Sequence, residues 1–212
     1  MMYLGKKSLI EHVIDRCLKS FHTSEVVLAT TTEPEDAVLA EFVTNTYGIN
    51  VVKGSNLDVR SRFVQIIDQY GCEYILRVTA DDPFKDPRDF DLCKRIVELD
   101  SIDYCCNFSN SNLPIGMDVE GFTAQSLLNS VKNSNSNLDR EHVTPNLRES
   151  SDYRRVFLVE NRASRAIRLT VDTPEDLELC NSIVELMDPE NYDWQHTLNC
   201  YTQIAKKNRG IL

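Results

Sequence analysis

Two aspartates stand just past apolar stretches at distant points of the sequence. Asp81 follows the stretch 74–78, and Asp172 follows the stretch 167–171. If both stretches are buried strands, each carboxylate lies beyond the carboxyl end of a strand, which is where α/β proteins bind ligands. Carboxylate oxygens suit Mg²⁺, which often takes one or two of them together with phosphate oxygens. The pair therefore predicts one Mg²⁺ held between two strand ends, with nucleotide phosphates completing its coordination.

Each aspartate alone also has a purely structural interpretation. Asp81-Asp82-Pro83 is common turn chemistry. Asp172 and Thr173 precede Pro174, and this order is typical of a helix N-cap followed by proline in the first turn. Taken singly, either stretch leaves both interpretations open, whereas two acidic strand ends on one sheet favour the metal site.

Two further polar segments could face a substrate. Arg140 and His142 lie in Asp139–Pro145, after an Asn/Ser-rich stretch, and could meet a carboxylate or a hydroxyl group. The same segment could instead cap a short helix and form surface ion pairs. Asp118 and Glu120 share one face of a predicted strand and could accept hydrogen bonds from sugar hydroxyls. A solvent-facing edge strand explains these two carboxylates equally well.

Strands and helices that could position these residues alternate along the chain. Ser8 and Glu11 form a capping box before the first helix, whose apolar residues recur with a period close to 3.6. The order of elements predicts an α/β fold with a mainly parallel sheet and helices on both faces. The predicted strands are 26–29, 50–52, 74–78, 103–107, 117–122, 156–159 and 167–171; the predicted helices are 9–21, 34–47, 58–70, 87–99, 124–131, 174–187 and 194–207; and polar loops are predicted at 108–116 and 132–138.

Composition excludes several classes of protein. The 212 residues fit one domain, 1–212, and the net charge of −10 argues against a nucleic-acid binder, which needs a basic face. No apolar run is long enough for a membrane span, and the N-terminal residues lack the apolar core of a signal peptide. The 7 cysteines show no Cys-x-x-Cys spacing, which predicts a cytoplasmic protein without disulfides or a zinc site.

Several segments, in collinear order, resemble the cytidylyltransferase family. Each segment alone is weak, but their order over nearly the whole chain, up to about Met187, is specific. The similarity is closest to the branch of spore-coat polysaccharide biosynthesis protein F, which is related to CMP-KDO and CMP-sialic acid synthetases. The segments are Glu11-His12-Val13-Ile14, Ala29-Thr30-Thr31-Thr32, Gly54-Ser55 with Asp58, Arg77-x-Thr79-x-Asp81-x-Pro83, Asp118-Val119-Glu120, Arg140-Glu141-His142-Val143-Thr144-Pro145 and Thr170-Val171-Asp172-Thr173-Pro174-Glu175-Asp176.

The resemblance implies a fold, a reaction and a set of site residues. The fold is a Rossmann-like nucleotidyltransferase sandwich, similar to that of nucleotide-diphospho-sugar transferases. The reaction moves CMP from CTP to a sugar acid and releases pyrophosphate, for surface polysaccharide or glycan synthesis. Asp81 and Asp172 fall where the family's metal-binding aspartates lie, so Mg²⁺ is the expected cofactor, and Arg140 is expected with them in catalysis. The remaining residues are expected to contact the two substrates: Arg77 and Thr30 the nucleotide, and Asp118, Glu120 and His142 the sugar acid. Outside the matched segments, Lys6 or Lys7 could contact a phosphate of the nucleotide.

The N-terminal residues depart from the family pattern. Family members begin with a buried central strand and a phosphate loop rich in glycine and arginine, whereas the segment 1–12 matches only the part of the family pattern after that loop. Strands beside the absent one are expected to lack a backbone partner, at about 1–3 kcal/mol for each unpaired buried group. Either about 25 upstream residues, a strand plus a loop, belong to the working protein, or the chain is a shortened homologue without transferase activity.

Other functions and the assembly stay open. The same sheet could serve a glycosyltransferase that uses a nucleotide-sugar donor, or a non-catalytic module that binds a nucleotide or a partner. The closing helix, 194–207, could form a homodimer interface or could be an ordinary amphipathic helix packed on its own chain.

Overall fold

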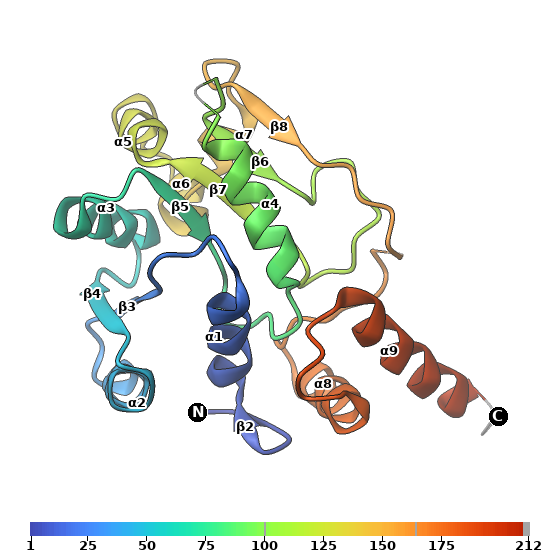
Figure 1. The fold of residues 1–212 in the computed structure, drawn as a ribbon. Helices are drawn as coiled ribbons and strands as arrows, with labels where there is room; N and C mark the ends of the chain where they lie inside the picture. The colour runs from blue at the N-terminus through green and yellow to red at the C-terminus, as the bar shows by residue number, and fades with distance from the viewer. Residues whose placement is uncertain (100, 164, 210–212) are drawn as a thin grey trace.

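The computed structural model describes residues 1–99, 101–163 and 165–209 as an α/β fold with helices on both sides of its sheets (Figure 1). The strands are β1 (Tyr3–Leu4), β2 (Lys7–Ser8), β3 (Val27–Thr31), β4 (Asn50–Gly54), β5 (Tyr74–Arg77), β6 (Tyr104–Cys106), β7 (Glu120–Thr123) and β8 (Arg155–Phe157). The helices are α1 (Leu9–Lys19), α2 (Ala37–Tyr47), α3 (Val59–Tyr70), α4 (Pro87–Val97), α5 (Ala124–Asn133), α6 (Asn137–His142), α7 (Pro145–Glu149), α8 (Pro174–Leu186) and α9 (Trp194–Arg209), and a short 3₁₀ helix, η1 (Pro34–Asp36), precedes α2. The predicted α/β class is confirmed.

Local sequence explains where the helices begin and end. The predicted capping box opens α1, where the backbone N–H of Ser8 donates to Glu11 Oε2 over 2.6 Å. A second capping box opens α8, where the N–H of Asp176 donates to Thr173 Oγ1 over 3.2 Å. Gly71 ends α3 with φ +62°, a left-handed conformation that glycine adopts without steric cost. Signals of this kind place most helix bounds close to their predicted positions.

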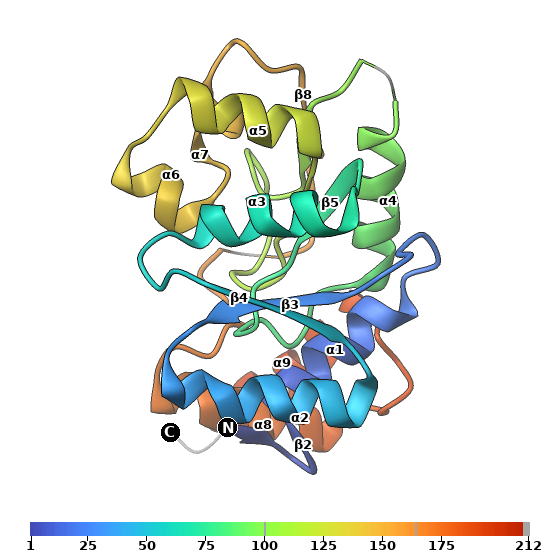
Figure 2. The same cartoon turned by 90° about the vertical axis from the view of Figure 1, so that its left-hand side faces the viewer.

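The longer strands form one parallel pair and one mixed sheet. β3 and β4 pair in parallel, with α2 and α3 on opposite sides of the pair (Figure 2). The mixed sheet has the order β5-β7-β6-β8, in which β6 and β8 are parallel and β7 runs antiparallel to both β5 and β6. The sheets are thus mixed where the sequence predicted a mainly parallel one. The reason is the connection 107–119, a fully described segment without a helix: a parallel return needs a long crossover, usually helical.

Both faces of the mixed sheet are buried. Tyr104 and Cys106 pack in a cluster with α3, α5 and α7, whereas Cys105, which points to the other face, packs with Phe90 and Cys93 of α4. Burial on both faces explains why these strands appear in the sequence as short apolar runs.

Three predicted segments differ from the structure. The stretch 167–171 is not a strand and forms one isolated bridge, between Arg168 and Ile115. The strand predicted at 117–122 begins only at Glu120. The Asn/Ser-rich stretch 132–138 is mostly the end of α5 and the start of α6, because the hydroxyl of Ser136 accepts from the N–H of Asp139 and caps α6.

A cavity of about 690 Å³ lies between β3 and β5. Within the described residues, β3 pairs only with β4, and β5 pairs only with β7. Within the described residues, each strand therefore presents one unpaired edge to this cavity. We call this cavity the β3–β5 groove. Its walls include Val27, Leu28 and Ala29 of β3, residues 74–77 of β5, and side chains of α1, α3 and α4.

The helices and the cysteines bear on two further predictions, about membrane spans and about disulfides. In the part of the chain that the structure describes, none of the helices is both long and apolar enough to cross a bilayer. The cysteines are all free: Cys93, Cys105, Cys106, Cys180 and Cys200 are buried, and Cys17 and Cys72 are partly buried. The prediction of cysteines without disulfides is confirmed.

Gly116 allows a close backbone approach that positions the second aspartate. Its φ is +93°, and a Cβ atom there would lie 2.7 Å from the backbone N of Thr170. We expect Gly116→Ala to lower the free energy of unfolding by about 3 kcal/mol or more, because backbone atoms cannot move aside cheaply. Gly48→Ala is the matched control, because Gly48 also has a positive φ, +67°, but faces open space. It should cost about 1–2 kcal/mol in urea unfolding, and equal losses in the two variants would contradict the argument.

Candidate active site

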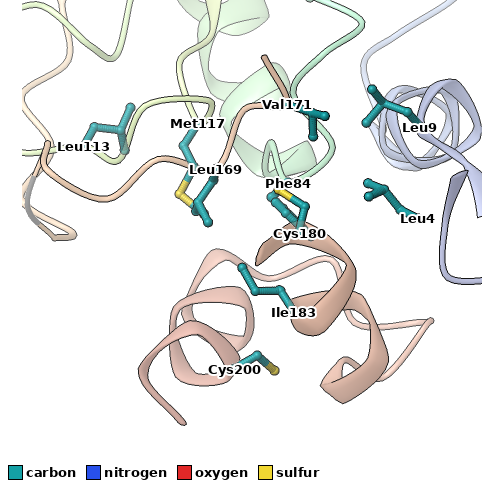
Figure 3. Packing of buried hydrophobic residues seen from close by; sticks show 10 residues of the cluster. All are labelled: Leu4, Leu9, Phe84, Leu113, Met117, Leu169, Val171, Cys180, Ile183 and Cys200. Atoms are coloured by element: carbon teal, nitrogen blue, oxygen red, sulfur yellow. The ribbon is translucent and has the colours of Figure 1, made fainter. Parts of the chain in front are cut away.

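Packing brings the two aspartate segments together. The N–H of Val171 donates to the backbone oxygen of Asp81 over 2.9 Å, so the segments that carry Asp81 and Asp172 lie side by side. Phe84 and Val171 belong to one buried cluster, to which α8 also contributes (Figure 3). This arrangement places the two acidic segments at the same end of the fold, as the sequence predicted.

Asp81 lies in surroundings that disfavour its charge. Partial burial raises the pKa of Asp81, and the nearby carboxylates of Asp82 and Asp172 raise it further. The side chain of Asp172 is exposed and forms an ion pair with Arg168, whose Nη2 lies 2.6 Å from Asp172 Oδ2. A cation bound between Asp81 and Asp172 would offset the repulsion between their carboxylates.

A buried lysine lies among these acids. The side chain of Lys85 is only 2% exposed, and its Nζ is 2.8 Å from Asp82 Oδ2 and 3.6 Å from Asp118 Oδ2. Burial acts to lower the pKa of Lys85, but the carboxylates of Asp118 and Asp82 outweigh it and the pKa rises. Sequence reasoning missed Lys85; the only signal is a single lysine in a stretch, 83–90, that is otherwise rich in proline and phenylalanine.

Glu120 connects three parts of the site. Its Oε1 accepts from Arg77 Nη1 over 2.7 Å, at the end of β5. Its Oε2 accepts from the hydroxyls of Tyr104, over 2.8 Å, and Thr144, over 2.7 Å. The carboxylate is buried and engaged by these internal donors, so it positions Arg77 on the groove wall instead of facing a sugar hydroxyl as predicted. Asp118 precedes the strand and keeps a side chain that is 37% exposed, so it remains open to a ligand.

The third predicted segment forms α6 and the turn after it. Arg140 Nε donates to Asn135 Oδ1 over 2.9 Å, and His142 is exposed at the end of the helix. The bond from Thr144 to Glu120 ties this segment to β7. Among the interactions of the described residues, none joins Arg140 or His142 to the two aspartates, so the structure supports the short-helix interpretation and leaves a ligand role as a prediction.

Of the two other residues predicted to contact the nucleotide, Thr30 is buried and Lys6 is exposed. Thr30 is buried in β3, and its hydroxyl donates to Asp36 Oδ2 over 3.0 Å. Lys6 is exposed in the turn between β1 and β2. Thr30 thus orders the start of α2, whereas Lys6 is free to reach a phosphate only if that phosphate lies near the hairpin.

Asp81 and Asp172 fit Mg²⁺ only if a nucleotide supplies further ligands to the ion. Across residues 1–99, 101–163 and 165–209, no cluster of three or more His, Cys, Asp or Glu side chains has the geometry of a complete metal site. Asp81 and Asp172 can supply two carboxylates, and Mg²⁺ commonly binds one or two carboxylates together with phosphate oxygens and water. The donor set therefore fits an ion that arrives with a nucleotide and that these two aspartates hold.

Comparison with known proteins identifies the family. A family model described as cytidylyltransferase matches residues 1–201. The chain belongs to the cytidylyltransferase family. The family resemblance inferred from the sequence is thereby confirmed, and with it the nucleotidyltransferase-like α/β fold.

Relatives of this chain support the assignment to the family. Spore coat polysaccharide biosynthesis protein SpsF of Bacillus subtilis (strain 168) is 30% identical over 190 residues, which cover 86% of this chain and 78% of SpsF. A solved cytidylyltransferase from Leptospira borgpetersenii serovar Hardjo-bovis has a TM-score of 0.86 and 25% identity, over 99% of this chain and 87% of that chain. CMP:2-keto-3-deoxy-manno-octonic acid synthetase complexed with CTP has a TM-score of 0.65 and 15% identity, over 87% of this chain and 90% of that chain, and shows the same fold.

Proposed function

We propose that this chain transfers a cytidylyl group from CTP to a sugar acid, giving a CMP-sugar and pyrophosphate for polysaccharide or glycan synthesis. The observation that carries the proposal is the hydrogen bond between Val171 and Asp81, which brings the segments of Asp81 and Asp172 together. The names of the relatives support it, because SpsF is a polysaccharide biosynthesis protein and the synthetase of similar fold is complexed with CTP. The free cysteines are consistent with a reducing compartment such as the cytoplasm.

The residues of the site would bind and align the two substrates. Asp81 and Asp172 would hold Mg²⁺, which when bound neutralises phosphate charge and aligns the α-phosphorus for in-line attack. Arg77, fixed by Glu120 over 2.7 Å, would direct its remaining N–H groups to the nucleotide. On the sugar side, the carboxylate of Asp118 would accept a hydrogen bond from a sugar hydroxyl, and the cationic Arg140 would pair with the carboxylate of the sugar acid.

CTP and Mg²⁺ should bind together. We expect 1 mM CTP with 5 mM Mg²⁺ to raise the melting temperature by about 5 °C or more, if CTP is near 100 times its Kd. CTP with EDTA should give a much smaller rise. Asp172→Asn should lose the Mg²⁺-dependent part of the rise, because it removes one of the two carboxylates.

Pyrophosphate release identifies the reaction. With CTP, Mg²⁺ and a panel of sugar acids, release above the rate without acceptor would support cytidylyl transfer. Binding of CTP without release would indicate a non-catalytic module. Stabilisation by nucleotide-sugars, with no pyrophosphate formed, would favour a glycosyltransferase. Failure of every nucleotide to raise the melting temperature would contradict the proposal. The oligomeric state, for which a homodimer is one prediction, is measurable on the same sample by light scattering.

A further inference from the structure

Arg168 is a solvent-accessible cation that pairs with one of the two predicted metal ligands. Its Nη2 donates to Asp172 Oδ2 over 2.6 Å. Its Nε donates to Asp176 Oδ1 over 3.3 Å, so one guanidinium bridges two carboxylates. The side chains of Arg168 and Asp172 are 42% and 53% exposed, whereas that of Asp176 is 10% exposed. A ligand can therefore reach Arg168 and Asp172 from solvent, but Asp176 is mostly covered by protein.

The two carboxylates differ in how firmly the protein holds them. Asp176 Oδ2 accepts from the backbone N–H of Asp172 over 3.2 Å and from that of Thr173 over 3.0 Å, as part of the capping box of α8. Among the hydrogen bonds of the described residues, the only one to the carboxylate of Asp172 comes from Arg168. Asp176 therefore anchors the guanidinium, whereas Asp172 can exchange it for another cation.

The main chain on both sides of Arg168 is fixed. The N–H of Ile115 donates to the backbone oxygen of Ile167 over 3.0 Å, and the N–H of Leu169 donates to the backbone oxygen of Ile115 over 2.8 Å. Leu169 and Val171 are buried in the apolar cluster that Figure 3 shows. The guanidinium of Arg168 can therefore change partners by rotation of its side chain while the main chain stays in place.

A divalent ion and Arg168 compete for Asp172. Mg²⁺ binds a carboxylate oxygen at about 2.0–2.1 Å, and Arg168 Nη2 already lies 2.6 Å from Oδ2 of the same carboxylate. Two cations on one carboxylate repel each other. In the absence of a nucleotide, Arg168 therefore weakens the binding of a divalent ion to Asp172. An ion that does bind displaces the guanidinium from Asp172, whereas the contact with Asp176 can remain.

A triphosphate reverses the effect of Arg168. It carries more negative charge than one Mg²⁺ neutralises, so a further cation beside the ion stabilises it. Among the ion pairs of the described residues, Lys85 meets Asp82 and Arg168 meets Asp172. The side chain of Lys85 is only 2% exposed, so of these two cations Arg168 is the one that a ligand can reach. A guanidinium has five N–H donors and matches phosphate geometry, so Arg168 can keep Asp176 and also bind a phosphate oxygen.

We propose that Arg168 exchanges Asp172 for a phosphate oxygen of CTP when Mg²⁺ binds Asp172, and that Asp176 holds the guanidinium during the exchange. The inference rests on the proposed function, because it needs a nucleotide beside the two aspartates. Arg168 then has opposite effects on two ligands: it weakens the binding of the ion alone and strengthens the binding of CTP with Mg²⁺. The site thereby favours an ion that arrives together with a nucleotide.

Two binding measurements on Arg168→Gln test the exchange without measuring catalysis. Mn²⁺ serves as the probe for the ion alone, because free Mn²⁺ gives an electron paramagnetic resonance signal that is lost on binding. We expect the variant to bind Mn²⁺ about threefold more tightly than the parent, since an exposed ion pair that competes with the ion is removed. It should bind CTP with excess Mg²⁺ about tenfold more weakly in calorimetry, since a hydrogen bond to a charged group is lost.

Two further variants separate the exchange from a general effect of removing an arginine. Arg168→Lys keeps the charge but not the planar fork, so both shifts should keep their signs and be smaller. Arg88→Gln is the matched control, because Arg88 is 58% exposed and its Nη2 also meets two carboxylates, Asp86 at 2.6 Å and Asp193 at 3.0 Å. Neither of these carboxylates is a predicted metal ligand, so Arg88→Gln should leave both affinities unchanged.

Three outcomes would overturn the exchange. Weaker binding of both ligands by Arg168→Gln would show that the arginine only supports the local structure. Tighter binding of both would show that it only competes with the ion. Unchanged affinity for both would show that it contacts neither. A parent protein that binds no CTP would contradict the proposed function itself, whereas a parent that binds CTP, together with any of the three outcomes, would contradict the exchange alone.

Discussion

Asp81→Asn is expected to make the protein more stable while removing the proposed cytidylyl transfer. The variant keeps the shape of the side chain but removes a charge that burial and the carboxylates of Asp82 and Asp172 disfavour. We expect the nucleotide-free protein to melt a few degrees higher, the shift that about 1 kcal/mol gives in a chain of this size. Cytidylyl transfer should fall by about 10³-fold or more, because metal-ion stabilisation of phosphoryl charge is worth several kcal/mol.

The stability gain of Asp81→Asn should depend on pH. The pKa of Asp81 in the folded protein is raised above its unfolded value, so its favourable contribution is complete below the unfolded pKa, near 3.9, and is lost as pH rises through the folded pKa. At neutral pH the charged group opposes folding, and asparagine removes that opposition. The difference in melting temperature between variant and parent should therefore be largest at pH 7 and should shrink toward pH 4.

Asp176→Asn is the matched control for Asp81→Asn. A hydrogen bond from Arg168 is the main cause that lowers the pKa of Asp176, so its charge favours folding. This substitution should lower the melting temperature at pH 7, the opposite sign. A lower melting temperature for Asp81→Asn as well, or transfer activity within tenfold of the parent, would contradict the role assigned to Asp81.

The proximity of the two acidic segments can be predicted from the sequence because it follows from the topology of the fold. Asp81 and Asp172 each follow an apolar stretch, and stretches buried in one α/β fold tend to end at a common edge. The segment of Asp172 lies beside that of Asp81 although the predicted strand 167–171 is not formed: a single bridge, from Arg168 to Ile115, and the bond from Val171 to Asp81 hold the stretch in place. Apolar patterning reports burial, and burial alone suffices to position the segment.

The sequence did not predict which distant strands and side chains pair with each other. The direction of β7 depends on the path of the connection 107–119, which carries no periodic signal. The role of Glu120 depends on Tyr104 and Thr144, which reach it from β6 and from the turn after α6. Alternation along a strand assigns Glu120 to a face, but only the packed fold shows that this face holds donors from other elements.

The role of Lys85 also depends on contacts between distant parts of the chain, which the sequence does not show. Replacing Lys85 gives the largest expected loss of stability. Lys85→Met removes the cation that faces Asp82 at 2.8 Å and Asp118 at 3.6 Å. Breaking a buried ion pair by removing one partner leaves an uncompensated charge and typically costs about 3–5 kcal/mol. We expect a loss of that size in the free energy of urea unfolding at pH 7. Lys7→Met is the control, because Lys7 meets Asp15 at 2.6 Å with a side chain that is 46% exposed, and surface pairs contribute about 1 kcal/mol or less.

A double substitution separates the loss of charge balance from the loss of packing. Asp82 is the nearest carboxylate to Lys85, whose Nζ also donates to the backbone oxygen of Asp118. The pKa of Asp82 stays low despite burial because Lys85 and the hydroxyl of Thr79 favour its charged form. Adding Asp82→Asn to Lys85→Met removes the carboxylate charge that the single variant leaves buried without its cation. The double variant should therefore recover more than half of the lost free energy of unfolding, a coupling that a double-mutant cycle measures directly. If the two losses simply add, Lys85 contributes through its hydrocarbon stem or its hydrogen bond to the backbone oxygen of Asp118, and the ion pair with Asp82 is not what stabilises this region.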